Sequence, residues 1–478
     1  MNEHDIRTST GAVKLPGGTF GQLFPLPISP FERYMLLDDS NEYPMSFVLI
    51  VNLKGCLHRV SFEQSALFAI ERHPLLMSRV GHVRGKGQCW LPEPTPAVPI
   101  DWQDGGQPVR NSVRQRIDLT REIGVRISVN RVPESAEVLF EFHHACTDGI
   151  GGVQFIGDLL AHYARLTALE GDELPEMEAV DVERLRARER FSISDSETSS
   201  KSVNSPFVLF RKLMKLVRRS PAPLVATRNH QRSGAALEFP AMISRTIERT
   251  ELQRLKVVAA QKSVELNDLY MFEMFQTLRD WNRNHSAAPD DQWLRIGMPT
   301  SLRTPQHDQM PAANVVSYMF LTRRAGDFDR PEEMLAGIHR QTSMVVNERL
   351  GRLAVNGLRY VLKVPGLLWC LLRLNRCFCT AILANVGDIR RQFRVRFPLK
   401  QGKCVAGNVV LESLMGSPPV RPNTRLSTSM GTYGGSLFIN LHCDPRSFSR
   451  EQAEELADLF VNRLRRISPA AADESKVA

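Results

Sequence analysis

The chain has 478 residues, which is long for a single hydrophobic core and fits two domains or two fused lobes. Its hydrophobic share of 42% and charged share of 24% are typical of globular proteins and argue against wholesale disorder. The net charge is +9, but no nucleic-acid recognition module accompanies it, so we expect no nucleic-acid partner.

The N-terminal elements begin after a flexible arm, which we predict over residues 1–20. A buried strand is predicted over Met45–Leu53, because this segment is rich in apolar and β-branched residues. A helix is predicted over Ser61–Glu71, with Ser61 as its N-cap and Gln64 three residues on to complete a capping box.

A second strand and a second helix flank the most distinctive segment of the chain. Ala136–Phe142 alternates apolar and polar residues as a strand does, and Ile150–Leu169 has the apolar spacing of a helix. The segment between them, His143–Gly149, reads HHACTDG and therefore lies at a strand-to-helix junction. A loop in this position can project a side chain into a cleft while rigid elements hold its ends.

Residues 177–240 are predicted to be a basic linker or crossover. Ser192–Ser202 is polar and rich in serine, which is a linker composition. Phe207–Arg219 is apolar on one side and basic on the other, so it fits either an interfacial amphipathic helix or a helix that packs across two lobes.

The second half of the chain mixes strands and helices in the same way. Helices are predicted over Glu251–Lys262, Leu266–Trp281, Glu332–Asn347 and Arg450–Leu464, and strands over Trp293–Met298, Ala313–Thr322 and Ser436–Leu441. We therefore predict two α/β lobes of similar build, over residues 21–176 and 241–468, and a disordered tail over residues 469–478.

The positive charge is concentrated in two parts of the chain. Residues 201–232 hold eight basic side chains and no acid, and residues 349–403 hold twelve basic side chains and one acid. Such patches attract the phosphates of a cofactor, an acidic carrier protein or an anionic membrane, although either patch can equally be a solvated basic face.

The remaining composition points to a cytoplasmic chain without a metal. The N-terminus lacks the apolar run of a secretory signal, and the longest apolar stretch, near Val364–Leu374, is too short to span a bilayer. The eight cysteines form no CxxC pair, and Cys377 and Cys379 have no second ligand pair nearby. We expect reduced thiols and no metal site.

The HHACTDG segment carries the chemistry of the sequence. A neutral imidazole is suited to accept a proton near pH 7, and two adjacent histidines followed by an aspartate and a glycine form a compact group. Other interpretations are open: the histidines and Asp148 as metal ligands, the histidines as ordinary half-buried residues, and Cys146 as a nucleophile or as a packing residue.

HHACTDG resembles the HHxxxDG signature of the CoA-dependent acyltransferase superfamily, which includes chloramphenicol acetyltransferase, condensation domains and bacterial wax ester synthases. Further segments that resemble this superfamily follow in the same order: Arg72–Arg79, Leu266–Leu269, Pro299–Arg303, Asn314–Tyr318 and Ala384–Asp388. The likeness covers roughly residues 20–468. It departs at Ala313 and Ala384, where glycine and serine are usual, and the absence of DFGWG sets the chain apart from plant BAHD enzymes.

The resemblance implies two chloramphenicol-acetyltransferase-like lobes that form a V with a central substrate channel. It implies transfer of an acyl group from an acyl thioester to a hydroxyl or an amine. The acyl-CoA or acyl-pantetheine is then a co-substrate, and no cofactor is bound permanently. The acceptor is a small molecule or a lipid, and an acyl carrier protein or a peripheral membrane surface, at the inner face of the membrane, is a possible partner.

The resemblance also implies roles for individual residues. His144 is the general base and His143 is structural, while Asp148 points away from the substrates and pairs with an arginine, for which Arg303 is the best candidate. Gly149 leaves room for the turn and for a substrate to pass. A further set, Asn314 and Ser317, supplies candidates for an oxyanion donor.

Three functions remain in view at this stage. A wax-ester-synthase-like or alcohol acyltransferase leads, followed by a condensation-type enzyme that takes a carrier-bound donor and forms an amide or ester. The third is a non-catalytic member of the superfamily that binds an acyl carrier or a lipid, including at a membrane surface.

Overall fold

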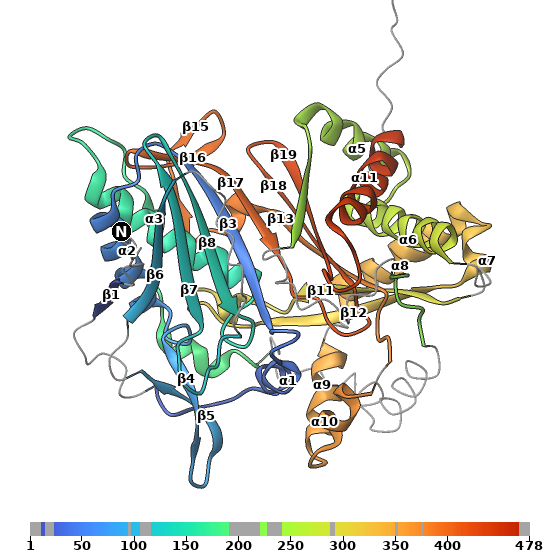
Figure 1. Cartoon of the computed structure of the whole chain (residues 1–478), viewed down its shortest axis with the longest axis horizontal. Coiled ribbons are helices and arrows are strands. Elements are labelled where there is room, and N and C mark those ends of the chain that lie inside the picture. The colour runs from blue at the N-terminus through green and yellow to red at the C-terminus, as the bar shows by residue number, and fades with distance from the viewer. Residues whose placement is uncertain are drawn as a thin grey trace, which may run out of the picture.

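The computed structural model describes residues 11–14, 23–93, 97–105, 116–190, 220–226, 241–286, 292–348, 352–374 and 376–467. In these residues two large sheets lie side by side, and helices cover one face of each (Figure 1). The mixed α/β architecture predicted from the sequence is therefore confirmed. Within the same residues, no helix combines the length and the apolar character that a membrane span requires.

The elements follow one another along the chain with these bounds. The strands are β1 Gly11–Lys14, β2 Leu26–Pro27, β3 Ser46–Lys54, β4 Ser78–Val83, β5 Gly87–Pro92, β6 Ala97–Asp104, β7 Val125–Val132, β8 Ser135–His143, β9 Glu176–Met177, β10 Met242–Ile247, β11 Leu294–Ser301, β12 Val316–Arg323, β13 Ala381–Asp388, β14 Val395–Arg396, β15 Leu399–Lys400, β16 Lys403–Ala406, β17 Val409–Ser417, β18 Leu426–Tyr433 and β19 Ser436–Cys443. The helices are α1 Pro30–Asp38, α2 Arg59–Arg72, α3 Gly149–Thr167, α5 Arg249–Gln261, α6 Leu266–His285, α7 Ala325–Phe328, α8 Pro331–Glu348, α9 Arg352–Leu362, α10 Leu367–Leu372 and α11 Arg450–Arg466.

The first sheet has eight strands in the order β1-β6-β7-β8-β3-β17-β16-β15. Its centre is β3, which pairs antiparallel with β8 on one side and with β17 on the other. Both faces of β3 are apolar: Phe47, Leu49 and Val51 enter the core under α2 and α3, while Val48 and Ile50 lie in a second cluster on the opposite face. A strand buried on both faces reads as a continuous apolar run, which is why its position was predictable.

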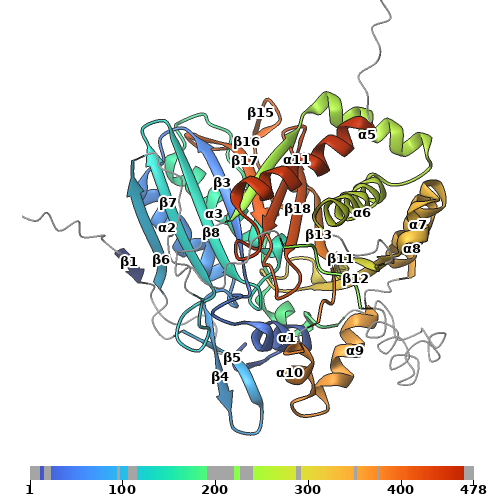
Figure 2. The same ribbon diagram turned by 45° about the vertical axis from the view of Figure 1, so that its right-hand side comes forward.

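The second sheet has six strands in the order β10-β19-β18-β13-β11-β12. Its core is formed with α5, α6, α8 and α11, and Figure 2 shows these helices together on the side away from the first sheet. The long α6 is anchored in this core by Tyr270, Phe275 and Trp281, which are almost completely buried. Each sheet therefore has its own hydrophobic core.

Two crossings join the sheets. Strands β15, β16 and β17 come late in the chain but complete the first sheet. In the other crossing, the segment between β11 and β12 sends Leu302, Ala312, Ala313 and Val315 into the core of the first sheet. The two halves are thus interlocked in space, and the second crossing carries residues toward the HHACTDG loop.

Most predicted elements lie within a few residues of their observed positions, with two instructive differences. Ser61 is not an N-cap: α2 begins at Arg59 after His58, whose backbone N–H donates to the Tyr163 hydroxyl at 3.0 Å. The strand predicted from Ala313 begins at Val316, because the backbone before it binds the loop at the start of α3 instead of a neighbouring strand.

Several predicted segments fall partly or wholly outside the described residues. These are Ser192–Ser202, Phe207–Arg219 and the tail over residues 469–478. Inside the predicted arm, Gly11–Lys14 forms β1 and pairs antiparallel with β6, so this part of the arm adds a strand to the edge of the first sheet.

Candidate active site

The HHACTDG loop links the end of β8 to the start of α3. The loop is held at its first residues by backbone hydrogen bonds: the His143 N–H donates to Gly124 O at 2.9 Å, and the His144 N–H donates to Met45 O at 2.8 Å. All loop residues from His143 to Asp148 except His144 are buried. The fold therefore fixes the loop and leaves one imidazole only half-buried.

Asp148 is the N-cap of α3 and the hub of the loop. One carboxylate oxygen accepts the Gly151 N–H at 2.9 Å and the other accepts the Val315 N–H at 2.9 Å. Arg303 donates to both oxygens, with Nη1–Oδ2 and Nη2–Oδ1 distances of 2.7 and 2.8 Å. The predicted ion pair between Asp148 and Arg303 is therefore present, in the bidentate form that fixes geometry best.

The electrostatics of Asp148 favour its charged form. Burial alone would raise the pKa of this carboxyl, but Arg303 and the N–H groups of Gly151 and Val315 outweigh burial and hold the pKa below its ordinary value. With its oxygens accepting four hydrogen bonds, Asp148 is suited to holding the loop to the second lobe rather than to exchanging protons.

Two glycines at the start of α3 differ in what they permit. A Cβ at Gly151 would lie 2.2 Å from Thr147 Oγ1 and 3.2 Å from Ala312 Cα, so only glycine lets the second lobe approach here. A Cβ at Gly149 would meet open space, and its backbone is not left-handed. The close approach of the second lobe therefore requires glycine at position 151, and the role of Gly149 stays a prediction.

His144 is the half-buried histidine of the loop. Its ring lies 5.0 Å from that of Phe47, centroid to centroid, and the Asn314 amide nitrogen lies 3.3 Å from its Nδ1. Burial lowers the pKa of His144, an effect that nearby backbone carbonyls and Asp148 oppose only in part. The imidazole is therefore uncharged at neutral pH, which is the state in which it can accept a proton.

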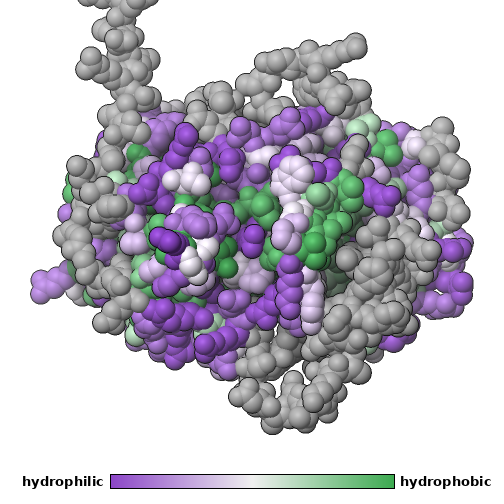
Figure 3. Space-filling view, turned by 90° about the horizontal axis from the view of Figure 1, so that it is seen from below, coloured by the Kyte–Doolittle hydropathy of each residue, from purple (hydrophilic) through white to green (hydrophobic). Residues whose placement is uncertain are grey.

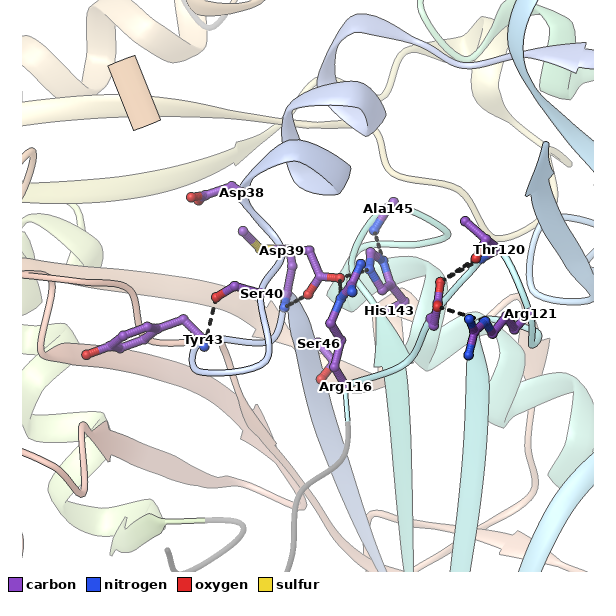
Figure 4. A network of polar contacts seen from close by, with 12 residues as sticks. Asp38, Asp39, Ser40, Tyr43, Ser46, Arg116, Thr120, Arg121, His143 and Ala145 are labelled. Carbon is purple, nitrogen blue, oxygen red and sulfur yellow. Dashed lines mark hydrogen bonds and ion pairs between the residues drawn. The ribbon is translucent and has the colours of Figure 1, made fainter. Parts of the chain in front are cut away.

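His143 has a partner close to each of its ring nitrogens, and its structural role stays a prediction. Its Nδ1 accepts the Ala145 N–H at 3.1 Å, and its Nε2 lies 3.4 Å from Oδ2 of Asp39. Asp39 in turn accepts the Met45 N–H and pairs with Arg116 (Figure 4). Because Nδ1 accepts a hydrogen bond, Nε2 carries a proton, and this N–H faces the Asp39 carboxylate.

His73 forms a matching arrangement with Asp158 of α3. Its Nδ1 accepts the Ala312 N–H at 2.8 Å, and its Nε2 lies 3.4 Å from Oδ2 of Asp158, which Arg72 also binds at 2.6 Å. His73 is buried, and burial lowers its pKa. The Arg72-His73 segment thus ties α2, α3 and the crossing from the second lobe together.

Asn314 lies just before β12 and contacts the HHACTDG loop, whereas Ser317 lies within β12. The Asn314 amide nitrogen donates to His144 O at 2.7 Å, so this side chain holds the backbone of the loop. Ser317 is completely buried on β12, where it pairs with Thr300 of β11. Asn314 therefore contacts the loop directly, and the oxyanion role suggested for Asn314 and Ser317 stays a prediction.

The other interpretations of the loop find no support in the geometry. Cys146 is completely buried, and burial raises the pKa of its thiol well above the ordinary value, so it is a packing residue rather than a nucleophile. Across the described part of the chain, no group of three or more His, Cys, Asp or Glu side chains is placed to hold a metal ion.

Sequence reasoning missed Asp39 and Asp158, although both place a shielded carboxylate beside a histidine that it singled out. Neither aspartate lies in a recognisable motif. A signal was present in hindsight: a charged residue beside or within an apolar segment, such as Asp158 in α3, is rarely buried without a partner.

Other segments that carried the resemblance also meet in space. Asn267 at the start of α6 accepts a hydrogen bond at 3.1 Å from the Asn385 amide on β13. Asp268 is buried, and it binds His339 at 2.7 Å and Thr342 at 2.6 Å on α8. These contacts join α6 to α8 and β13 within the second half of the chain.

Comparisons with known proteins agree with this architecture. No protein-family model matches the chain. An uncharacterized protein of Mycobacterium tuberculosis is 24% identical over 325 residues, which cover 66% of this chain and 71% of that protein. This relative brings no described activity with it.

Solved structures match over almost the whole chain. The starter condensation domain of rhizomide synthetase, in complex with C8-CoA, has a TM-score of 0.64 at 14% identity and covers 94% of this chain and 95% of its own. The trichothecene 15-O-acetyltransferase of Fusarium sporotrichioides has a TM-score of 0.64 at 12% identity, over 92% of this chain and 94% of its own. The fold is thus that of condensation domains and CoA-dependent acyltransferases, as the sequence resemblance implied.

Proposed function

We propose that the protein transfers an acyl group from an acyl thioester to a hydroxyl or an amine, with His144 as the general base. The observation that carries this proposal is the contrast within one loop. His143 and residues 145–148 are buried, whereas His144 is half-buried and its lowered pKa favours the neutral ring. A neutral imidazole on a rigid support is what proton abstraction requires.

The proposed reaction has two proton transfers. The neutral imidazole takes the proton from the attacking hydroxyl or amine as its oxygen or nitrogen bonds to the thioester carbonyl carbon. The tetrahedral intermediate then collapses, the C–S bond breaks, and the imidazolium returns the proton to the departing thiolate. The Asp148–Arg303 pair keeps the loop in register with the second lobe throughout, without exchanging a proton itself.

The donor in this proposal is an acyl-CoA or an acyl group on a carrier protein. The structurally similar starter condensation domain of rhizomide synthetase was crystallised with C8-CoA, which supports testing a medium-chain acyl-CoA first. A hydroxyl acceptor follows the example of the trichothecene 15-O-acetyltransferase. An amine acceptor is suggested by the rhizomide synthetase starter condensation domain in complex with C8-CoA and Leu-SNAC, because a leucyl group carries an amine. Wax-ester-like synthesis with a long-chain alcohol is the lipid form of the same reaction.

The test is release of free thiol from acyl-CoAs of different chain lengths, each paired with alcohols and amines. We expect His144→Ala to lower the rate by about a hundredfold or more, since a general base contributes about 10²–10⁴. His82→Ala is the matched control, because His82 is an exposed histidine on β4 and should retain full activity.

Two results would contradict the proposal. Equal release by wild type and His144→Ala would show that the imidazole is not the base. Binding of acyl-CoA without any release, including with a carrier-bound donor, would instead favour the non-catalytic member of the superfamily that binds an acyl carrier or a lipid.

A further inference from the structure

The hairpin formed by α9 and α10 exposes an unusual number of apolar side chains. Val364 and Trp369 are 53% and 47% exposed, and the neighbouring Tyr360, Leu367 and Leu374 are exposed as well. These five residues, which we call the hairpin patch, lie within 15 positions of one another. Figure 3 views the molecule from the side on which α9 and α10 lie, and apolar residues gather near the middle of this face.

The exposure of the hairpin patch is not a result of a loosely attached hairpin. Val355 is buried and Leu358 packs against the core of the first sheet, while Leu368 is buried on α10. Both helices pack against α1, and α9 also packs against β12. The inner side of the hairpin is therefore satisfied, and a helix whose inner side is packed is expected to carry polar residues outside.

Positive charges border the hairpin patch. From residue 349 to residue 387 the chain contains no acid, and four basic side chains, Arg359, Lys363, Arg373 and Arg376, are exposed on or beside the hairpin. Two of them lie over the aromatic rings of the patch: Lys363 Nζ is 5.0 Å from the centroid of Tyr360, and Arg373 Cζ is 4.4 Å from that of Trp369.

We propose that the hairpin patch docks on the surface of a lipid bilayer that contains anionic headgroups. Exposed aliphatic tips beside Trp and Tyr suit the boundary between acyl chains and headgroups, and bordering Lys and Arg suit anionic lipid. A second copy of this chain would place the same cations against one another. The basic border therefore favours an anionic surface over self-association.

The hairpin packs against elements that lie next to the candidate active site. α9 packs against β12 and against α1. Asn314, two residues before β12, contacts His144, and Asp39 follows the last residue of α1. A bilayer on this face would lie next to the elements that carry the candidate active site. The proposal itself concerns binding and stands or falls independently of the acyltransferase activity.

The test is co-sedimentation of the full chain with vesicles of phosphatidylcholine alone and of phosphatidylcholine with phosphatidylglycerol. We expect binding to the anionic vesicles that weakens as salt is raised, because the electrostatic contribution is screened. The double variant Val364→Ser with Leu367→Ser should lower the partition coefficient roughly tenfold, since two exposed apolar side chains no longer enter the interface.

The matched control keeps the chemistry of the substitution and moves it elsewhere. Val257→Ser with Leu399→Ser removes two apolar side chains that are more exposed than those of the hairpin variant, each 55% exposed, from α5 and β15, and should bind vesicles like wild type. Lys363→Glu with Arg373→Glu should lower binding to anionic vesicles roughly tenfold or more while leaving weak binding to phosphatidylcholine unchanged.

Three outcomes would overturn the proposal. One is absence of vesicle binding by wild type. Another is equal loss of binding in the hairpin variant and in the control. The third is a wild-type dimer in analytical ultracentrifugation that the hairpin variant abolishes, without vesicle binding, because the patch would then cover a second copy of the chain.

Discussion

The HHACTDG loop and the α9–α10 hairpin are built on opposite principles. In the loop, polar groups such as Asp148, His143 and the backbone N–H of His144 have partners elsewhere in the chain. In the hairpin, the apolar side chains of the hairpin patch are between 37% and 53% exposed. The side chains of the loop therefore find their contacts within the molecule, whereas those of the hairpin, as we propose, find them on a surface outside it.

This comparison predicts that breaking the loop damages the protein far more than altering the hairpin. The largest effect is expected for Arg303→Ala, which leaves the buried Asp148 carboxylate without its cation. Loss of one partner of a buried ion pair costs about 3–5 kcal/mol, and we expect the lower end because Gly151 and Val315 still donate to Asp148. Urea unfolding measures this loss.

The control for this substitution is Arg330→Ala. Arg330 pairs with Glu333 at 3.2 Å, but both side chains are exposed, so the loss of free energy of unfolding should stay below about 1 kcal/mol. A similar cost for the two variants would mean that the Asp148–Arg303 pair does not hold the loop to the second lobe.

A smaller effect is expected when the two lobes are pushed apart at one point. Gly151→Ala places a Cβ 2.2 Å from Thr147 Oγ1 and close to the backbone of Ala312, which should cost about 1–3 kcal/mol and lower kcat. Gly149→Ala meets open space and should leave the free energy of unfolding nearly unchanged. If both glycines tolerate alanine equally, the close approach of the lobes at α3 is not required.

The pH dependence of activity tests the protonation state of His144 directly. A base acts in its neutral form, and burial lowers the pKa of His144 from the ordinary histidine value of about 6.5. We therefore expect kcat/KM for the reaction to stay level as the pH falls toward 6.5 and to drop only below it. A midpoint above 7 in the wild-type profile would contradict an uncharged His144 at neutral pH.

The smallest effect is expected in the hairpin. Val364→Ser with Leu367→Ser should change the free energy of unfolding by no more than about 0.5 kcal/mol, because both side chains are already exposed in the folded chain. Thermal unfolding without lipid measures this. A large destabilisation would show that these side chains pack within the molecule, and exposed apolar side chains would then no longer support membrane binding.

The sequence predicted the parts of the site that local patterns encode. A strand, a seven-residue motif and a helix follow one another directly, so the placement of His144 at their junction needed no knowledge of distant contacts. The pair of Asp148 with Arg303 was reached through resemblance, because 155 positions separate the two residues. The division of the chain at residues 176 and 241 stays a prediction.

The remaining parts of the fold depend on pairings without a local signature. Strand β17 completes the first sheet from the far end of the chain, and a strand's sequence states that it will pair but not with which partner. The partners of His143 and His73, which are Asp39 and Asp158, lie outside the motifs that contain the histidines. Burial of a charged residue becomes visible only when the core is assembled.

The placement of β17 also has a consequence for synthesis. While the chain emerges from a ribosome, β3 has β8 on one side, but its other edge stays open until residues 409–417 are made. An open apolar edge is a template for pairing with other chains. We therefore expect a fragment that stops before β15 to aggregate, and the nascent first half to need a chaperone until its last strands arrive.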